Sequence, residues 1–240
     1  MTALERSGLL LAGGRSSRMG RPKALLDLAG EPLVAHAARS LFAVCDEVVL
    51  AVAPREQADD AYIAALADAV RGVAPQGEAH VLVVRDAEAF RGPVGGLATA
   101  LAAARGRLAI AVACDTPFVA RPLLEGLFAR AEAPCEYDVV LPVRDGRPEP
   151  LLAVYRVATA GPHFARRLAQ GGGRPTNGLS DALRVRTIEG EELRALDSDE
   201  ASFANVNSPD ELETARSRLA SLTARGSRRT RSRTGSSEGG

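Results

Sequence analysis

Short continuous runs of apolar residues alternate along the chain with longer segments in which apolar residues recur at helical spacing. Short apolar runs between turn residues are typical of buried strands, and the helical spacing is typical of helices that bury one face. The predicted strands cover residues 8–12, 47–53, 80–84, 108–113, 138–142, 151–156 and 184–188. The predicted helices cover residues 32–44, 55–70, 94–105, 122–130, 159–170 and 209–222.

The order of these elements predicts the fold class. A strand, a loop and a helix repeat four times in succession, which implies right-handed crossovers and a mostly parallel sheet with helices on both faces. We therefore expect an α/β protein with a Rossmann-like, three-layer α/β/α architecture. Ligands of such sheets bind beyond the carboxyl ends of the strands, so chemistry is expected in the loops that start at Ala12, Arg85 and Cys114.

The domain organisation follows from the absence of an internal linker or repeat. We expect a single domain over residues 1–223, followed by a tail at 224–240 that is rich in Arg, Ser and Gly. Such a tail can bury little apolar surface, so we predict that it is disordered. A solvated tail is favoured over a specific binding arm.

Charge and composition exclude several classes of function. The 30 Lys and Arg residues balance 30 Asp and Glu residues, so no overall field attracts nucleic acid or a membrane surface. Aromatic residues make up 4% of the chain, too few for platforms that stack single-stranded nucleic acid. The three cysteines show no paired spacing, and the first apolar run is too short for a signal peptide. We expect a cytoplasmic protein with no nucleic-acid and no membrane partner.

The loop after the first strand reads LAGGRSSRMGRPK over residues 11–23. Gly13 and Gly14 allow the main chain to approach a phosphate closely, and Arg18 and Lys23 add two cations within reach of a triphosphate. The string is neither the dinucleotide fingerprint GxGxxG nor a P-loop, which excludes a dehydrogenase. A plain glycine turn with exposed basic residues would explain two glycines, but it is disfavoured for the whole string after a buried strand.

Two further loops carry candidate chemistry. The glycines of residues 91–96 allow the main chain to contact a base or a sugar, although a turn that leads into a helix explains them equally well. Their place after the third strand favours the functional interpretation. Asp115 follows the fourth strand, where a carboxylate can hold Mg²⁺ while the metal grips nucleotide phosphates. A helix cap is the alternative for this aspartate, and metal binding is favoured because both other loops are present.

These and other strings of the chain resemble those of a known family. Residues 11–33 resemble the signature that opens the guanylyltransferases of molybdenum cofactor maturation, within the wider pyrophosphorylase-like nucleotidyltransferases of the nucleotide-diphospho-sugar transferase type. The other strings that resemble the family are 92–96 (its GPLAG loop), 115–117 (its DxP motif), 147–155 (its acceptor-side segment) and 203–209 (its FxNxNTP motif). The resemblance spans about residues 9–212.

The resemblance implies transfer of GMP from GTP to the terminal phosphate of molybdopterin or the molybdenum cofactor, with release of pyrophosphate and Mg²⁺ as cofactor. It implies a nucleotide-binding half at about 1–132 and an acceptor-binding half at about 133–223. Molybdoenzymes or their chaperones would be the partners that receive the product. The implied nucleotide-binding residues are Leu11, Ala12, Gly13, Gly14, Lys23, Asp86, Gly92, Pro93 and Gly95. The implied catalytic residues are Arg18, Lys23 and Asp115 (Asp115 also as metal ligand), and the implied acceptor-binding residues are Pro150, Asn205 and Asn207.

One departure from the family pattern concerns the base. The Gly13-Gly14 pair is typical of guanylyltransferases, but the asparagine that the family often has after its second strand is absent, because residues 51–54 read AVAP. A cytidylyltransferase or a sugar-phosphate nucleotidyltransferase of the same fold is therefore the first alternative. A non-catalytic nucleotide-binding adaptor is the second, and Arg18, Lys23 and Asp115 disfavour it because an adaptor needs no metal carboxylate.

Overall fold

The computed structural model describes residues 4–13, 23–75, 80–86, 92–133 and 137–234, with side chains to residue 222. The elements of the first half are β1 (Arg6–Ala12), η1 (Lys23–Leu25), β2 (Asp27–Leu28), β3 (Glu31–Pro32), α1 (Leu33–Phe42), β4 (Glu47–Val52), α2 (Asp60–Arg71), β5 (His80–Arg85), α3 (Gly92–Ala103), β6 (Leu108–Ala113) and α4 (Arg121–Glu132). Those of the second half are β7 (Val139–Arg144), β8 (Arg147–Pro148), η2 (Pro150–Leu152), β9 (Val154–Arg156), α5 (Val157–Ala169), α6 (Leu179–Ala182), β10 (Val185–Ile188), α7 (Gly190–Leu196), η3 (Ala201–Phe203) and α8 (Pro209–Thr234).

The central sheet has the strand order β10-β7-β9-β6-β1-β4-β5, with β8 paired to β7. Strands β1, β4, β5 and β6 run parallel to one another, and β10 runs parallel to β7. Strand β9 lies between β6 and β7 and runs antiparallel to both. The register places Ala12 beside Val52, Leu11 beside Ala113, and Val52 beside Arg85. The carboxyl ends of four parallel strands therefore meet at one edge, as predicted.

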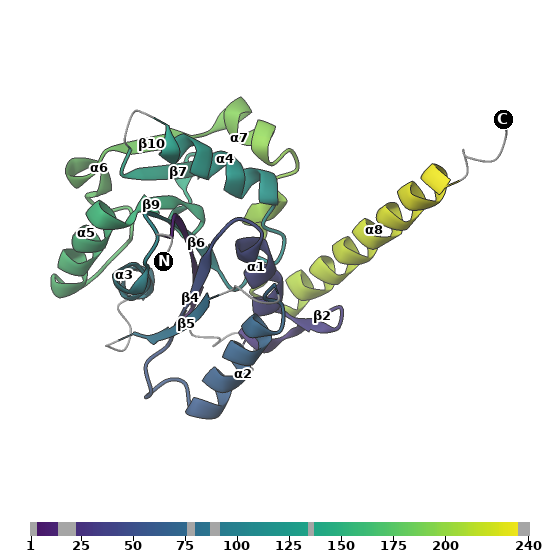
Figure 1. The fold of residues 1–240 in the computed structure, drawn as a ribbon, viewed down its shortest axis with the longest axis horizontal. Helices are drawn as coiled ribbons and strands as arrows, with labels where there is room; N and C mark the ends of the chain where they lie inside the picture. The colour runs from purple at the N-terminus through teal and green to yellow at the C-terminus, as the bar shows by residue number, and fades with distance from the viewer. Residues whose placement is uncertain (1–3, 14–22, 76–79, 87–91, 134–136, 235–240) are drawn as a thin grey trace.

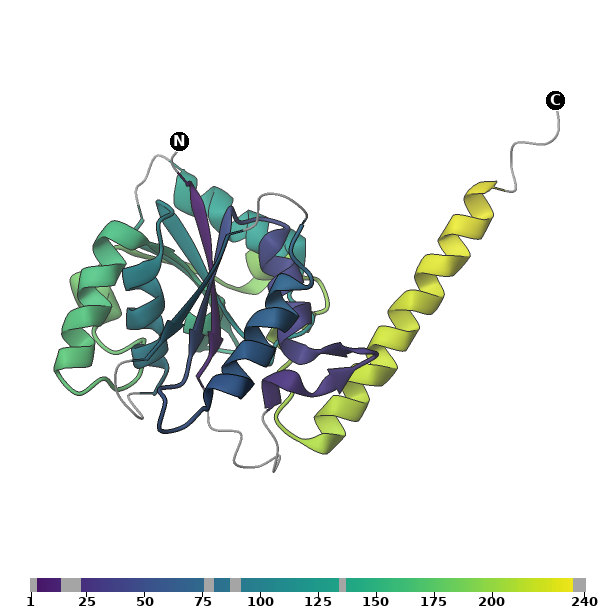
Figure 2. The ribbon, with the colours of Figure 1, turned by 60° about the horizontal axis from the view of Figure 1, so that its bottom comes forward.

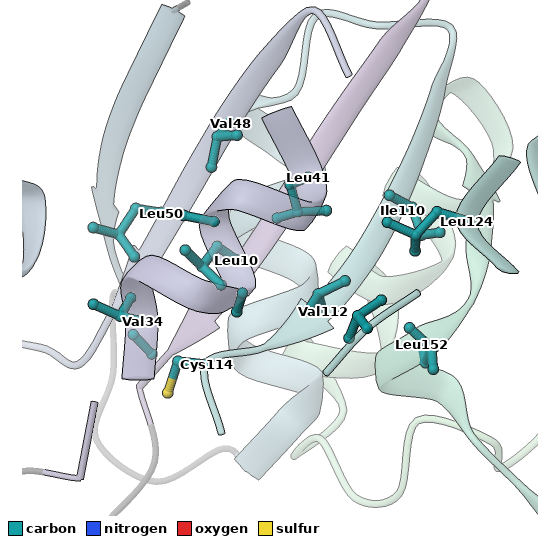
Figure 3. Close-up of a cluster of buried hydrophobic side chains, with 14 of the residues drawn as sticks. Leu10, Val34, Leu41, Val48, Leu50, Ile110, Val112, Cys114, Leu124 and Leu152 are labelled. Atoms are coloured by element: carbon teal, nitrogen blue, oxygen red, sulfur yellow. The ribbon is translucent and has the colours of Figure 1, made fainter. Parts of the chain in front are cut away.

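Helices cover both faces of this sheet, which confirms the three-layer prediction. Helices α1, α2 and α4 lie on one face, while α3 and α5 lie on the other (Figures 1 and 2). Alternate residues of one strand serve the two cores, since Leu10 belongs to the first and Leu9 to the second. In Figure 3 Leu10 and Leu50 from neighbouring strands lie on the side of the sheet that α1 covers with Val34 and Leu41. Burial on both faces explains why the strands read as continuous apolar runs.

A third, smaller cluster joins the β2–β3 hairpin to the start of α8, through Leu28, Leu33, Val206, Leu212 and Ala215. Beyond this contact α8 projects away from the body (Figures 1 and 2). The helix continues to Thr234, so the predicted helix end near Leu222 is wrong, while the predicted disorder of the tail at 224–240 stays a prediction. The reason is that no proline follows Pro209, and the Arg and Ala residues there are good helix formers. Residues 235–240 lie outside the described part.

Smaller differences from the predicted elements are all local. The second helix starts at Asp60 rather than at 55, because the Asp59 carboxylate accepts a hydrogen bond from Tyr62 N at 2.7 Å and caps the helix. The predicted strand at 151–156 begins as the short helix η2 and becomes strand β9 only at Val154. The short elements β2, β3, α6 and α7 were not predicted. In the described chain no helix is long and apolar enough to cross a membrane.

Candidate active site

A cavity of about 350 Å³ opens at the edge where the parallel strands end. Its walls come from the loop after β1, from η1, from the segment between β4 and α2, from the end of β5, from the start of α3, from the end of β6 and from η2. The lining residues are Leu11, Ala12, Gly13, Lys23, Ala24, Pro54, Gln57, Tyr62, Asp86, Gly92, Pro93, Gly96, Ala113, Cys114, Asp115 and Leu151. The topology thus brings all three predicted loops to one cavity.

Lys23 and Asp115 form an ion pair at this cavity, and each side chain is 16% exposed. The Lys23 ammonium also donates a hydrogen bond to Asn207 Oδ1 at 2.7 Å. The main-chain N–H of Val206 donates to the Asp115 carbonyl oxygen at 2.9 Å, which holds the segment of Asn207 against the end of β6. The predicted acceptor segment therefore contacts the predicted nucleotide-binding residue Lys23 through Asn207 and the predicted metal ligand Asp115 through Val206.

The second carboxylate oxygen of Asp115, Oδ1, is buried and has no hydrogen-bond partner among the described residues. Buried polar atoms are almost always paired, so this oxygen is available to a ligand in the cavity. Carboxylate oxygen is a preferred ligand of Mg²⁺, which proteins often hold by one or two carboxylates together with substrate phosphates. The described part of the chain contains no group of three or more His, Cys, Asp or Glu side chains that could hold a metal ion. The donor set therefore fits a metal that arrives with a nucleotide.

Asp86 is the second acidic side chain that lines this cavity. Its main-chain N–H donates to Val52 O at 3.0 Å, so the β4–β5 ladder positions it. A Cβ on Gly13 would lie 3.3 Å from Asp86 Oδ2, so glycine is what lets the first loop approach this carboxylate. Burial raises the pKa of Asp86 above its ordinary value, although a hydrogen bond from Thr99 opposes the shift. The Oδ1 atom of Asp86 has no partner in the described structure.

The glycine-rich second loop has a different form from the predicted turn. Gly92, at φ +60°, and Pro93 form the first turn of α3 and line the cavity, so the N-terminus of this helix faces it. Free N–H groups and the helix dipole make such an end attractive to anions. Gly95 is buried within α3, and Gly96 takes its place at the cavity wall.

The three residues predicted to bind the acceptor differ in their burial and contacts. Asn207 is partly buried and contacts Lys23, whereas Asn205 is exposed. Pro150 begins η2, and the cavity wall as described contains its neighbour Leu151 instead. Gly14 and Arg18 lie outside the described residues, so their predicted roles stay predictions.

Three lining residues from the segment after β4 and the first turn of α2 were not predicted: Pro54, Gln57 and Tyr62. The apolar spacing of residues 55–70 predicts one helix, whereas Gln57 lies in the loop before α2 begins at Asp60. Its Nε2 atom is buried and unpartnered among the described residues. Burial raises the pKa of Tyr62 to about 12, so its phenol stays protonated at neutral pH. The position of Gln57 directly beyond a strand end was the available signal.

A mostly parallel sheet that gathers two carboxylates, a lysine and a helix N-terminus around one cavity at its strand ends is typical of nucleotide-binding proteins of the α/β class. Residues 8–183 match the family model described as the MobA-like NTP transferase domain. The chain belongs to this family of nucleotidyltransferases.

Individual relatives agree with the family match. The chain is 35% identical over 221 residues to the probable molybdenum cofactor guanylyltransferase of Natronomonas pharaonis, covering 90% of this chain and 98% of that protein. It is 34% identical over 207 residues to the molybdenum cofactor guanylyltransferase of Pseudomonas putida, covering 85% and 94%.

Solved structures confirm the predicted fold. The molybdopterin-guanine dinucleotide biosynthesis protein A of Archaeoglobus fulgidus superposes with a TM-score of 0.69 at 26% identity, over 90% of this chain and 99% of that one. The 4-diphosphocytidyl-2C-methyl-D-erythritol synthase of Anaerococcus prevotii gives a TM-score of 0.63 at 9% identity, over 91% and 100%. The second likeness is one of fold alone.

Proposed function

We propose that this protein transfers GMP from GTP to the terminal phosphate of molybdopterin or the molybdenum cofactor and releases pyrophosphate. The relatives named molybdenum cofactor guanylyltransferase support this choice of substrates. The observation that carries the proposal is the contact of Lys23 with both Asp115 and Asn207. This contact brings the segment expected to bind the acceptor to the residues expected to bind the nucleotide.

The chemistry follows from the charges of the reacting groups. An oxygen of the acceptor phosphate forms a bond to the α-phosphorus of GTP, and the bond from that phosphorus to the β-phosphate bridging oxygen breaks. Pyrophosphate leaves with the electron pair of that bond. The attacking oxygen is already anionic, so the site needs no strong general base, and the work of the protein is positioning and charge neutralisation. In this mechanism Lys23 and Arg18 stabilise the triphosphate.

The proposal includes Mg²⁺ dependence. Asp115 Oδ1 is the buried, unpartnered carboxylate oxygen that would hold the ion together with nucleotide phosphates. When bound there, Mg²⁺ supplies positive charge to the phosphates. The pairing of Oδ2 with Lys23 fixes the orientation of the carboxylate.

The remaining roles divide between the two halves of a single domain over residues 1–223. We propose that about 1–132 binds the nucleotide and about 133–223 the acceptor, with Pro150, Asn205 and Asn207 on the acceptor side. The nucleotide-binding residues would be Leu11, Ala12, Gly13, Gly14, Lys23, Asp86, Gly92, Pro93 and Gly95. We further propose that the reaction takes place in the cytoplasm and that molybdoenzymes or their chaperones receive the product.

Pyrophosphate release tests the proposal. Purified protein with Mg²⁺ and molybdopterin is offered GTP, CTP, ATP or UTP, and calorimetric titration measures the binding of each nucleotide. We expect binding and turnover with GTP and little with the others. Preference for CTP would make the protein a cytidylyltransferase, and binding without pyrophosphate release for any acceptor would make it an adaptor. Turnover without added divalent metal, in the presence of a chelator, would overturn the Mg²⁺ requirement.

A further inference from the structure

Three buried polar side-chain atoms of cavity-lining residues have no hydrogen-bond partner in the described part of the chain: Gln57 Nε2, Asp86 Oδ1 and Asp115 Oδ1. A buried polar atom without a partner destabilises the folded state, so three such atoms around one cavity indicate that a ligand supplies the partners. The oxygen of Asp115 is accounted for by a metal in the function proposed above. Gln57 Nε2, a hydrogen-bond donor, has no role in that function.

The segment of Gln57 is held by Arg85, the residue that directly precedes Asp86. The segment after β4 turns back on itself, and the guanidinium of Arg85 donates to Ala58 O at 3.2 Å. The same guanidinium forms an ion pair with Asp60, at the start of α2. Arg85 is the last residue of β5 and directly precedes Asp86. A donor side chain and an acceptor side chain are thus tied to the same strand end by one arginine.

The cavity around these two side chains is otherwise largely apolar, with Ala12, Ala24 and Pro54 among its walls. In such pockets a few polar groups set the orientation and the identity of the ligand. The main chain at 51–54 carries only apolar side chains, so it offers no side-chain hydrogen bond to a base. The polar side chains that the described residues contribute from this side of the cavity are therefore those of Gln57, Tyr62 and Asp86, and of these Gln57 and Asp86 have a buried polar atom without a partner.

We propose that Gln57 is a specificity-determining residue that reads the guanine base together with Asp86. The Watson–Crick edge of guanine presents the O6 acceptor beside the N1–H and N2–H donors, whereas adenine presents a donor beside an acceptor at N1. Gln57 Nε2–H donates to O6, and the Asp86 carboxylate accepts from N1–H and N2–H. This inference rests on the proposed use of GTP and names the side chain that selects it.

The test compares Gln57→Ala with the wild-type protein by calorimetric titration with GTP, with 6-thio-GTP and with magnesium pyrophosphate. The sulfur of 6-thio-GTP is a weak acceptor in place of O6, so it removes the same hydrogen bond from the ligand side. We expect Gln57→Ala to bind GTP roughly tenfold to a hundredfold more weakly, as expected when a buried donor–acceptor pair is lost. We expect its affinity for pyrophosphate to be unchanged and its preference for GTP over 6-thio-GTP to disappear. Gln170→Ala, an exposed glutamine at the end of α5, is the matched control and should behave as wild type.

Comparing Gln57→Ala and Gln57→Glu with the wild-type protein separates failure of the role of Gln57 from failure of the proposed function. Gln57→Glu keeps the side-chain length but presents a carboxylate to O6, so it should weaken GTP binding more than Gln57→Ala does. If the wild-type protein prefers GTP over the other nucleotides and both variants bind GTP as tightly as it does, the role of Gln57 is overturned and the proposed function stands. Equal loss of GTP and pyrophosphate affinity would also overturn it, because base reading does not touch the phosphates. A wild-type protein that does not prefer GTP over CTP, ATP and UTP would overturn the proposed function and this inference together.

Discussion

Lys23 Nζ donates a hydrogen bond to Asn207 Oδ1 at 2.7 Å, although the two residues lie near opposite ends of the described chain. The same ammonium forms an ion pair with Asp115, so one cation joins the first loop, the end of β6 and the segment before α8. The main-chain bond from Val206 to Asp115 reinforces the third of these connections. The proposed acceptor segment is therefore held by the same cation that we propose neutralises the nucleotide, and we infer that Asn207 is a positioning residue for Lys23.

Replacing Asn207 by Ala removes a hydrogen bond to a charged group, while the ion pair of Lys23 with Asp115 remains. We expect kcat/KM to fall roughly tenfold to a hundredfold, since bonds to charged groups contribute about 1.5–3 kcal/mol. Steady-state pyrophosphate release with GTP and molybdopterin measures this. Asn177→Ala, at an exposed asparagine in the turn before α6, is the control and should keep wild-type rates. Unchanged kcat/KM in Asn207→Ala would contradict the positioning role.

Replacing Asp115 by Asn removes the charge that pairs with Lys23 and the proposed metal ligand. We expect turnover to fall roughly 100- to 1000-fold, the scale of losing one charge-stabilising group. The melting temperature should change little, because the bond to Val206 uses the main-chain oxygen. Asp145→Asn is a matched control: Asp145 has a φ of +49°, which asparagine tolerates well. Substantial Mg²⁺-dependent activity in Asp115→Asn would overturn the assignment.

The ionised side chain of Asp86, which we propose binds the nucleotide, lowers the stability of the folded protein. Burial raises its pKa above the ordinary 3.8, so the ionised carboxylate destabilises the folded state at neutral pH. This cost is present in full above the folded pKa and fades as the pH falls through it toward 3.8, below which the group is neutral in both states. Asp86→Asn should therefore melt higher than wild type at pH 7, with a difference that shrinks on acidification, and should bind GTP more weakly. A lower melting temperature at pH 7 would contradict the sign of this effect.

Glu47 stabilises the opposite edge of the sheet. Its buried carboxylate accepts from Ser7 Oγ at 2.7 Å, from Arg105 N at 2.7 Å and from Arg105 Nε at 2.8 Å. Burial acts to raise the pKa of Glu47, but these hydrogen bonds outweigh it and hold the pKa below its ordinary value. The stabilisation is thus complete above pH 4.5 and is lost as the pH falls through the folded pKa.

Glu47→Gln should therefore lower the free energy of unfolding by roughly 1–3 kcal/mol at pH 7, the cost of leaving buried partners poorly satisfied. Urea unfolding at pH 7 and again below pH 4.5 checks this, because the difference from wild type should shrink at the lower pH. Glu56→Gln, at an exposed glutamate, should change stability by no more than about 0.5 kcal/mol. A pH-independent difference would show that the charge of Glu47 contributes nothing.

The sequence by itself determined the order of strands and helices in the first half and the loops at which the cavity lies. Both are local properties: apolar spacing reports which faces are buried, and parallel strands bring their carboxyl ends to one edge. For this reason Gly13, Lys23, Asp86 and Asp115 could be predicted as neighbours before their contacts were known.

Only the tertiary structure decided the antiparallel insertion of β9 between β6 and β7, the contact of Lys23 with Asn207, and the presence of Gln57 in the cavity. Strand pairing and side-chain contacts between distant segments depend on how the whole chain packs, which no local pattern encodes. Gln57 shows the limit most clearly, because its spacing fits a helix while the Asp59 cap and Arg85 hold it in a loop. Local propensity differs little between those two states, and packing against a neighbouring strand decides between them.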